Sequence, residues 1–155
     1  MQTNTPDSFV RNIPELLEQH TIQVQPQGYS MYPLFVPGRD SAILEKADCR
    51  LLKRGDVILY RRKSGILVLH RICRITKDGF YTVGDNQTAV EGPLLSSQIY
   101  GRLTGIVRNG HAFTVKYPVY RILSGIWLFL RPVRRPICLL TAKLKSIVNI
   151  FLIRY

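Results

Sequence analysis

The sequence contains only three cysteines, Cys49, Cys73 and Cys138, and no two of them form a CxxC pair. A disulfide framework needs an even set of cysteines, and a structural zinc site needs closely spaced ligands. We therefore expect neither, and nothing in the sequence predicts a metal or another cofactor.

Long apolar runs are also missing. No stretch reaches the roughly 18–20 uninterrupted apolar residues that a membrane-spanning helix requires. The first residues are polar and acidic and are interrupted by Pro6 and Pro14, so they do not look like a secretory signal. A chain of 155 residues with 46% hydrophobic residues is nevertheless long and apolar enough to form a domain with a buried core.

Acidic residues are absent from the end of the chain. Residues 1–110 hold 14 Lys and Arg and all 10 Asp and Glu, whereas residues 111–155 hold 8 basic residues and no acidic one. The net charge of +12 is thus mainly a property of this C-terminal part.

The C-terminal part also combines its basic residues with apolar blocks that include Trp127 and Phe129. This composition is typical of helices that lie in the plane of a membrane, and the lack of acids suits anionic lipid headgroups. We expect residues 117–155 to form two short helices, separated by residues 131–136, that bind membrane lipid. The alternative is a helical tail packed on the domain itself or on a second subunit.

The rest of the chain has the pattern of short strands between Gly and Asp turns. A short helix is expected over residues 9–20, with Pro14 near its first turn. Strands are expected over 21–24, 41–45, 57–60, 66–75, 80–83, 103–107 and 112–115. The sequence therefore predicts a mainly β fold, with an antiparallel barrel or sandwich. Its parts are an N-terminal segment (1–20), a β-domain (21–116) and a basic helical tail (117–155).

A loop after the first expected strand presents a small hydroxyl group. Gly28 lets the backbone turn sharply, and Pro33 discourages a helix from starting at Tyr32. Met31 is a flexible apolar side chain that can anchor in the interior and direct Ser30 outward. Ser30 is therefore placed where a nucleophile would be accessible, but a serine also needs a base within hydrogen-bond reach.

His70 is the best candidate for that base. In a strand over 66–72 it shares a face with Ile66 and Val68, so it ends an apolar stripe at the core or at its rim. A neutral imidazole in such a place can accept a proton from a serine hydroxyl near neutral pH. The alternative is a histidine that only packs in the core.

A carboxylate beside His70 would hold the imidazole in the required tautomer. Two residues are candidates: Asp85, in the turn after the strand over 80–83, and Glu91, a few residues later. Because Gly, Asp and Asn are common turn formers, the turn at Asp85 has a purely structural interpretation as well. Gly55 and Asp56 have the same ambiguity, and we interpret them as structural.

Four segments occur in a familiar order: GYSMYP at 28–33, KRGDVI at 53–58, HRI at 70–72 and VGDN at 83–86. Together they resemble the type I signal peptidases and their SOS-repressor relatives, over about residues 28–107. The serine box is the most specific segment and, in that family, carries the nucleophile, which falls on Ser30. Gly28, Met31 and Pro33 are the other positions of this box and are expected to shape the substrate-binding loop.

The resemblance also points to a branch of the family. Bacterial members typically use a lysine as base, whereas the ER-type branch, also found in archaea and some bacteria, has His-Arg there. His70 and Arg71 match the histidine branch. Family members carry an acidic pair a few residues past Gly-Asp-Asn, but here a single Glu91 stands one residue further on. Asp85 lies in the Gly-Asp-Asn box itself, so both acids remain candidates.

The start of the chain departs from the family, whose members usually have a membrane anchor ahead of the serine box. Here 27 residues precede Gly28, and none of them forms a membrane span. We expect that the anchoring role has moved to residues 117–155, with the side of the membrane left open. The SOS-repressor relatives have a DNA-binding domain in front, for which 27 residues are too few.

The resemblance implies a membrane-associated serine endopeptidase that cleaves signal or leader peptides of precursor proteins. Family members bind substrate as an added strand, for which residues 21–24 or the surroundings of Ile43 are candidate edges. The alternative is a non-catalytic basic β-domain that binds a membrane surface or nucleic acid, because a charge of +12 attracts polyanions. Tyr60, Phe80 and Tyr81 are too scattered for an RNA-binding face, so we expect no nucleic-acid partner.

Overall fold

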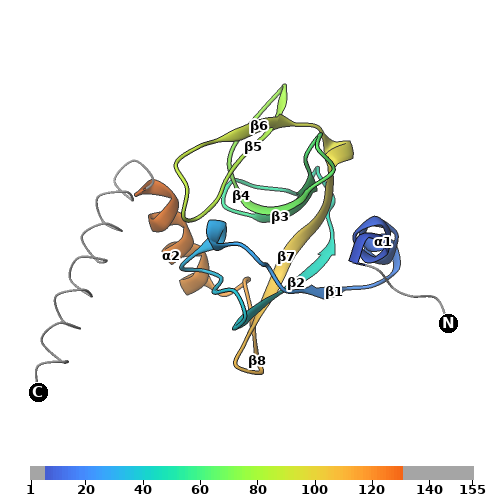
Figure 1. The fold of residues 1–155 in the computed structure, drawn as a ribbon. Coiled ribbons are helices and arrows are strands. Elements are labelled where there is room, and N and C mark those ends of the chain that lie inside the picture. Colours follow the sequence, from blue (N-terminus) through green and yellow to red (C-terminus); the bar gives the residue numbers. More distant parts are fainter. Residues whose placement is uncertain (1–5, 131–155) are drawn as a thin grey trace, which may run out of the picture.

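The computed structural model of the chain describes residues 6–130. These residues form one antiparallel sheet with a helix at either end of the described chain (Figure 1). The elements are α1 (Pro6–Gln19), β1 (Ile22–Val24), the 3₁₀ turn η1 (Tyr29–Met31), β2 (Asp40–Lys46), β3 (Val57–Arg61), β4 (Leu67–Thr76), β5 (Gly79–Val83), β6 (Glu91–Leu94), the 3₁₀ turn η2 (Ser96–Gln98), β7 (Ile99–Arg108), β8 (His111–Thr114) and α2 (Pro118–Phe129).

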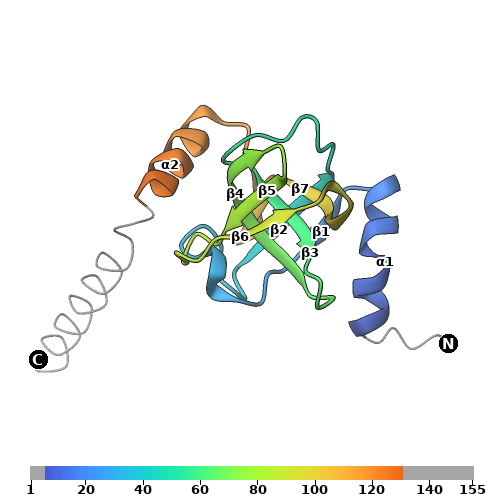
Figure 2. The same ribbon diagram turned by 90° about the horizontal axis from the view of Figure 1, so that it is seen from above.

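The strands follow the order β1-β2-β7-β3-β4-β5-β6, and β8 pairs with β7. Every strand pair is antiparallel, so the predicted fold class is confirmed. Figures 1 and 2 show α1 and α2 on opposite sides of the strands. The sheet therefore forms the centre of the described part, and each helix covers a different side of it.

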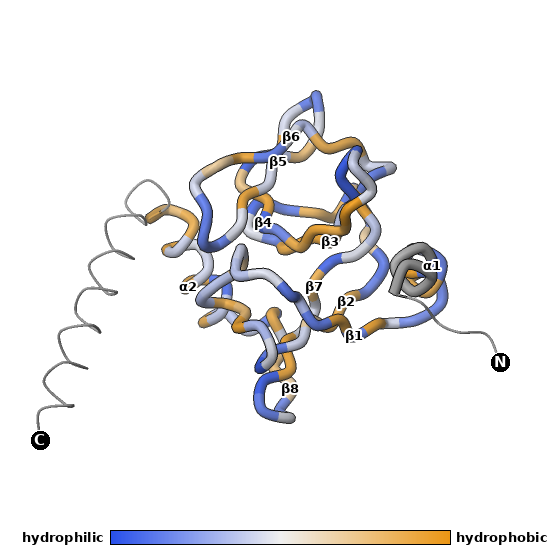
Figure 3. The backbone as a smooth tube through the Cα atoms, viewed as in Figure 1, coloured by the Kyte–Doolittle hydropathy of each residue, from blue (hydrophilic) through white to orange (hydrophobic). Residues whose placement is uncertain are grey.

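Two apolar clusters lie on the two sides of the coiled sheet, because both faces of β3 and β4 are covered. One cluster contains Leu59 and Leu69 together with the inner residues of α1, and the other contains Ile58, Tyr60 and Ile72. Figure 3 shows β3 as a mainly hydrophobic stretch, as expected for a strand buried on both faces. Neighbouring residues of β4 therefore face different buried surroundings.

Helix α1 begins earlier than the expected helix over 9–20 and ends one residue before it. The prediction that Pro14 lies near the first turn is wrong, since Pro14 lies well inside the helix. A proline there removes one backbone hydrogen bond. Burial of Ile13 and Leu17 against the core supplies the compensating contacts.

Two segments differ from the expected strands. Strand β7 begins at Ile99, earlier than expected, and β6 was not expected at all. The β6 sequence contains Gly92 and Pro93 and has no alternating pattern, so only its pairing with β5 makes it a strand.

The order of strands also decides which edges an extended peptide can reach. Strand β1 is terminal in the sheet order and pairs with β2 alone. The expectation of an edge near Ile43 is wrong, because β2 pairs with β1 on one side and β7 on the other.

Helix α2 is the first of the two helices expected in the C-terminal part, and the second lies outside the described residues. Among residues 6–130, no helix combines the length and the apolar character needed to cross a bilayer.

Candidate active site

Ser30 lies in the short 3₁₀ turn η1, between the exposed Tyr29 and the buried Met31. The turn is closed by a hydrogen bond from the Tyr32 N–H to the Tyr29 carbonyl, at 3.1 Å. Met31 is 1% exposed and belongs to the core, so its expected role as an anchor is confirmed. The side chain of Ser30 is half-buried, at the boundary between that anchor and solvent.

The other residues of the serine box differ in exposure. Gly28 and Pro33 are exposed on either side of η1, where a bound peptide can touch them. Met31 is fully buried and can influence a substrate only through the turn that it anchors.

The turn that contains Gly84, Asp85 and Asn86 contacts the Ser30 turn. The Asn86 N–H donates a hydrogen bond to the Ser30 carbonyl oxygen at 2.8 Å. A Cβ atom added to Gly84 would lie 2.6 Å from the same oxygen, so only glycine permits this approach. Strand β4, which carries His70, lies next to η1. The fold thus brings the serine turn, the Gly-Asp-Asn turn and the histidine strand together.

His70 is 1% exposed, and its Nδ1 atom lies 3.2 Å from the Tyr60 hydroxyl oxygen. That hydroxyl donates its own proton to Glu91 Oε2 at 2.7 Å. Because the Tyr60 proton is used in this way, the Tyr60 oxygen accepts the hydrogen bond from an Nδ1–H group of the imidazole. This tautomer leaves Nε2 unprotonated, which is the form that a general base requires.

Glu91 completes the group around the imidazole. Its Oε1 atom lies 3.6 Å from His70 Nδ1, and Arg62 binds both carboxylate oxygens. Hydrogen bonding from Arg62 lowers the pKa of Glu91 below its ordinary value. Glu91 is therefore ionised near neutral pH, and it faces the protonated side of the ring.

Burial determines the protonation states of His70 and Tyr60. Desolvation lowers the pKa of His70 to about 4, against a smaller raising effect of Glu91. Burial likewise raises the pKa of Tyr60 above its ordinary value. Near neutral pH the site therefore holds a neutral imidazole, a neutral phenol and an ionised carboxylate.

Asp85 takes a different partner. Its two oxygens accept hydrogen bonds from Nε and Nη2 of Arg71, each at 2.8 Å, and both side chains are 1% exposed. Arg71 Nη1 also donates to the Gly55 carbonyl at 2.7 Å. Burial opposes the charge on Arg71, but Asp85 outweighs it and raises the pKa of the guanidinium. Of the two candidate acids, Glu91 is the one that approaches the imidazole.

Sequence reasoning missed Tyr60 and Arg62. The strand pattern carried a signal for Tyr60: Ile58 lies directly opposite His70 in the β3–β4 pair, and Tyr60 is two residues further along the same face. Arg62 follows β3 in a basic loop, where nothing in the sequence distinguishes it from its neighbours.

A comparison with curated proteins finds similarity to Signal peptidase I W of Bacillus subtilis, with 36% identity over 81 residues. The match covers 49% of this chain and 43% of that protein, so it spans less than half of the relative. No protein-family model matches the chain. The similarity supports a signal-peptidase-like family for about half of the chain, whereas the histidine branch stays a prediction.

Proposed function

We propose that this protein is a serine endopeptidase that cleaves leader peptides from precursor proteins, with Ser30 as nucleophile and His70 as general base. The observation that carries the proposal is the state of His70. It is a buried, neutral imidazole whose Nδ1–H is bound by Tyr60, on a strand next to the turn that carries Ser30. The name of the Bacillus relative supports leader peptides as the substrate class.

In the proposed reaction, the Ser30 hydroxyl oxygen attacks the scissile carbonyl carbon while His70 Nε2 accepts the hydroxyl proton. The backbone N–H of Ser30 donates to the oxyanion that forms on the carbonyl oxygen. His70 then returns the proton to the leaving amine as the peptide C–N bond breaks. Water hydrolyses the resulting ester, with His70 acting as base for a second time.

Glu91 is the acid that we assign to His70, and it acts mainly through Tyr60. When Nε2 takes a proton, the ring becomes an imidazolium with Nδ1–H directed at the Tyr60 oxygen. The hydrogen bond from Tyr60 to Glu91 increases the electron density on that oxygen, and Glu91 itself lies close to Nδ1. Both effects stabilise the imidazolium and hence the transition state.

The substrate would bind as an extended strand. Strand β1 offers a sheet edge that residues 25–28 connect to the serine turn, and an extended peptide can add to it through backbone hydrogen bonds. Gly28 and Pro33 are exposed beside Ser30 and would border the residues at the cut.

We also propose that the protein acts at a membrane surface through residues 117–155. The described part of this segment is α2, which has an exposed apolar face. The segment as a whole carries no acidic residue to repel anionic lipid.

The test is cleavage of a synthetic leader peptide by the purified full chain. Wild type should cleave it at one bond, and Ser30→Ala and His70→Ala should lower kcat by about 10⁴-fold or more. Ser64→Ala is the matched control, because Ser64 is exposed in the loop between β3 and β4 and should leave kcat unchanged. Full activity of a correctly folded Ser30→Ala variant would contradict the proposal.

A further inference from the structure

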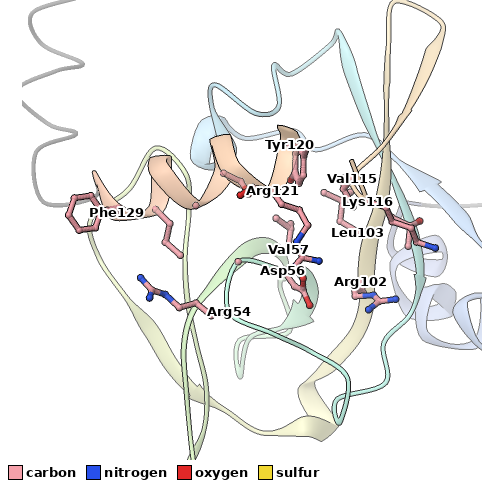
Figure 4. Close-up of a pocket in the computed structure, with 15 residues that line it drawn as sticks. Arg54, Asp56, Val57, Arg102, Leu103, Val115, Lys116, Tyr120, Arg121 and Phe129 are labelled. Atoms are coloured by element: carbon pink, nitrogen blue, oxygen red, sulfur yellow. The ribbon is translucent and has the colours of Figure 1, made fainter. Parts of the chain in front are cut away.

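A cavity of about 520 Å³ lies between α2 and the sheet, and neither Ser30 nor His70 lines it (Figure 4). Its walls come from the residues before β3, from β7, from the segment after β8 and from α2. The mechanism proposed above uses none of the side chains that line it.

The cavity has an excess of positive charge. Arg54, Lys116 and Arg121 line it, and none of the three pairs with a carboxylate of the described residues. A fourth lining cation, Arg102, binds Glu45. Asp56 is the carboxylate in the lining, and one of its oxygens accepts the Lys53 backbone N–H. Three cations against this one carboxylate leave the lining with a net positive charge, which an anion from solution can offset.

The same cavity has apolar walls. Val57, Leu103 and Leu128 are buried side chains that line it, and the exposed Phe129 lies at its rim, at the C-terminal end of α2. A small inorganic anion would use only the cations and leave this apolar surface uncovered. The lining instead suits a ligand with an anionic head and an apolar body.

The outer face of α2 adjoins the cavity and is unusually apolar. Its apolar side chains are 52–77% exposed and recur at helical spacing: Val119, Ile122, Leu123, Ile126 and Phe129. The inner face is fixed to the domain by buried Leu128 and by Trp127, whose Nε1–H donates to the Asp85 carbonyl at 2.8 Å. Phe129 belongs to both surfaces, so the exposed face reaches the rim of the cavity.

We propose that the cavity binds the phosphate headgroup of an anionic lipid while the outer face of α2 enters the apolar part of the same membrane leaflet. This inference rests on the membrane association proposed above and assigns it to one site. A nucleic acid would match the cations but not the apolar helix face, whereas a lipid matches both.

The first test measures binding of the full chain, as Ser30→Ala, to phosphatidylcholine vesicles with and without phosphatidylglycerol. The variant pair Lys116→Glu and Arg121→Glu should weaken binding to the anionic vesicles by at least about tenfold. The matched pair Lys63→Glu and Lys77→Glu makes the same change in net charge at exposed sites outside the cavity, and should weaken it less than about threefold. Equal losses in the two pairs would overturn the headgroup site.

The second test addresses the helix face. Ile122→Gln with Leu123→Gln should weaken vesicle binding by about tenfold, whereas Ile66→Gln with Leu95→Gln, equally exposed elsewhere, should not. Unchanged binding would mean that another segment of the chain covers the face. A lipid-free dimer in sedimentation that the first pair dissociates would assign the face to a second copy. Either result overturns the proposal.

Two further measurements show which of the two proposals, the peptidase or the lipid site, is wrong. Glycerol phosphate in solution should compete weakly, and full competition by it would assign the cavity to a soluble phosphate compound instead of a lipid. Cleavage of a soluble leader peptide is measured separately with wild-type protein. If wild-type protein does not cleave the peptide but the vesicle results are as predicted, only the peptidase proposal is refuted. If it cleaves the peptide but the vesicle results differ from the prediction, only the lipid site is refuted.

Discussion

His70 and Arg71 are consecutive residues of β4, and each is 1% exposed, yet their surroundings differ in kind. Arg71 meets Asp85 in a closed pair in which the guanidinium satisfies both carboxylate oxygens. His70 meets Tyr60 and Glu91 through Nδ1 only, and burial keeps the ring neutral. The first arrangement holds charge in place, and the second leaves one ring nitrogen able to take a proton.

The difference shows how one strand serves both structure and chemistry. Alternation directs the two side chains to opposite faces, and both faces are buried. The Arg71–Asp85 pair fixes the turn whose next residue, Asn86, binds the Ser30 carbonyl. We infer that Asp85 acts on the site through the fold, and Glu91 through the imidazole. Four changes test this division.

The largest effect is expected from Arg71→Met. It removes the two hydrogen bonds that Arg71 donates to the buried Asp85 carboxylate, which should lower the free energy of unfolding by about 3–5 kcal/mol. Urea denaturation measures the loss. Arg74→Met is the control on the same strand, because Arg74 is exposed and only stacks on Tyr81, and it should cost less than about 1 kcal/mol. A loss below about 1 kcal/mol for Arg71→Met would remove the structural role of this pair.

Glu91→Gln should affect activity more than stability. Its ion pair with Arg62 is partly exposed, so the free energy of unfolding should change by less than about 1 kcal/mol. The kcat for peptide cleavage should fall by about 10–100-fold, because the imidazolium loses a nearby negative charge. Glu45→Gln, which also loses an ion pair with an arginine, should leave kcat unchanged. If Glu91→Gln kept kcat within about twofold, the acid would have to be sought elsewhere.

Tyr60→Phe isolates the connection between Glu91 and His70. The phenyl ring fills the same space but no longer binds Nδ1–H, so kcat should fall by about tenfold with KM unchanged. The comparison is with Tyr100→Phe, at a half-buried tyrosine on β7. An increase in KM with constant kcat would show that Tyr60 contacts the substrate instead of positioning His70.

The last change concerns the pH dependence of stability. The pKa of His70 is about 4 in the folded protein against an ordinary 6.5, so the unfolded chain binds the additional proton between these values. Stability should therefore decrease as the pH falls from about 6.5 to about 4, with a slope of about 1 kcal/mol per pH unit. His70→Gln should lose this part of the slope in urea titrations at each pH. Parallel stability curves for the two proteins would mean that the pKa of His70 is the same in the folded and the unfolded protein, and would contradict this prediction.

The sequence was sufficient for much of the fold. The strands that alternate or run apolar, such as β3 and β4, were predicted because burial determines their pattern. Strand β6 was missed because its Gly-Pro sequence gives no local signal and only pairing with β5 defines it. The predicted position of Pro14 near the start of the helix was also wrong. Contacts of Ile13 and Leu17 with the core outweigh the preference of proline for the first turn of a helix.

The candidate site was predictable in its residue types but not in its connections. Ser30 and His70 were predicted from their local patterns, and the fold places the turn and the strand that carry them side by side. The choice between Asp85 and Glu91 depends on which carboxylate Arg71 takes, and that is a property of the folded core. The role of Tyr60 could not be predicted either, because it depends on a hydrogen bond that forms only in the folded protein and connects β3 to β6.

The central claim is that the Ser30 hydroxyl and the His70 imidazole act as one unit. A cycle of Ser30→Ala, His70→Ala and the double variant, measured as kcat on one leader peptide, tests it most directly. When two groups act as one unit, replacing either one costs the enzyme as much activity as replacing both. The double variant should therefore be no slower than the slower single variant. Losses that multiply in the double variant would show that the two residues contribute independently, and would contradict the claim.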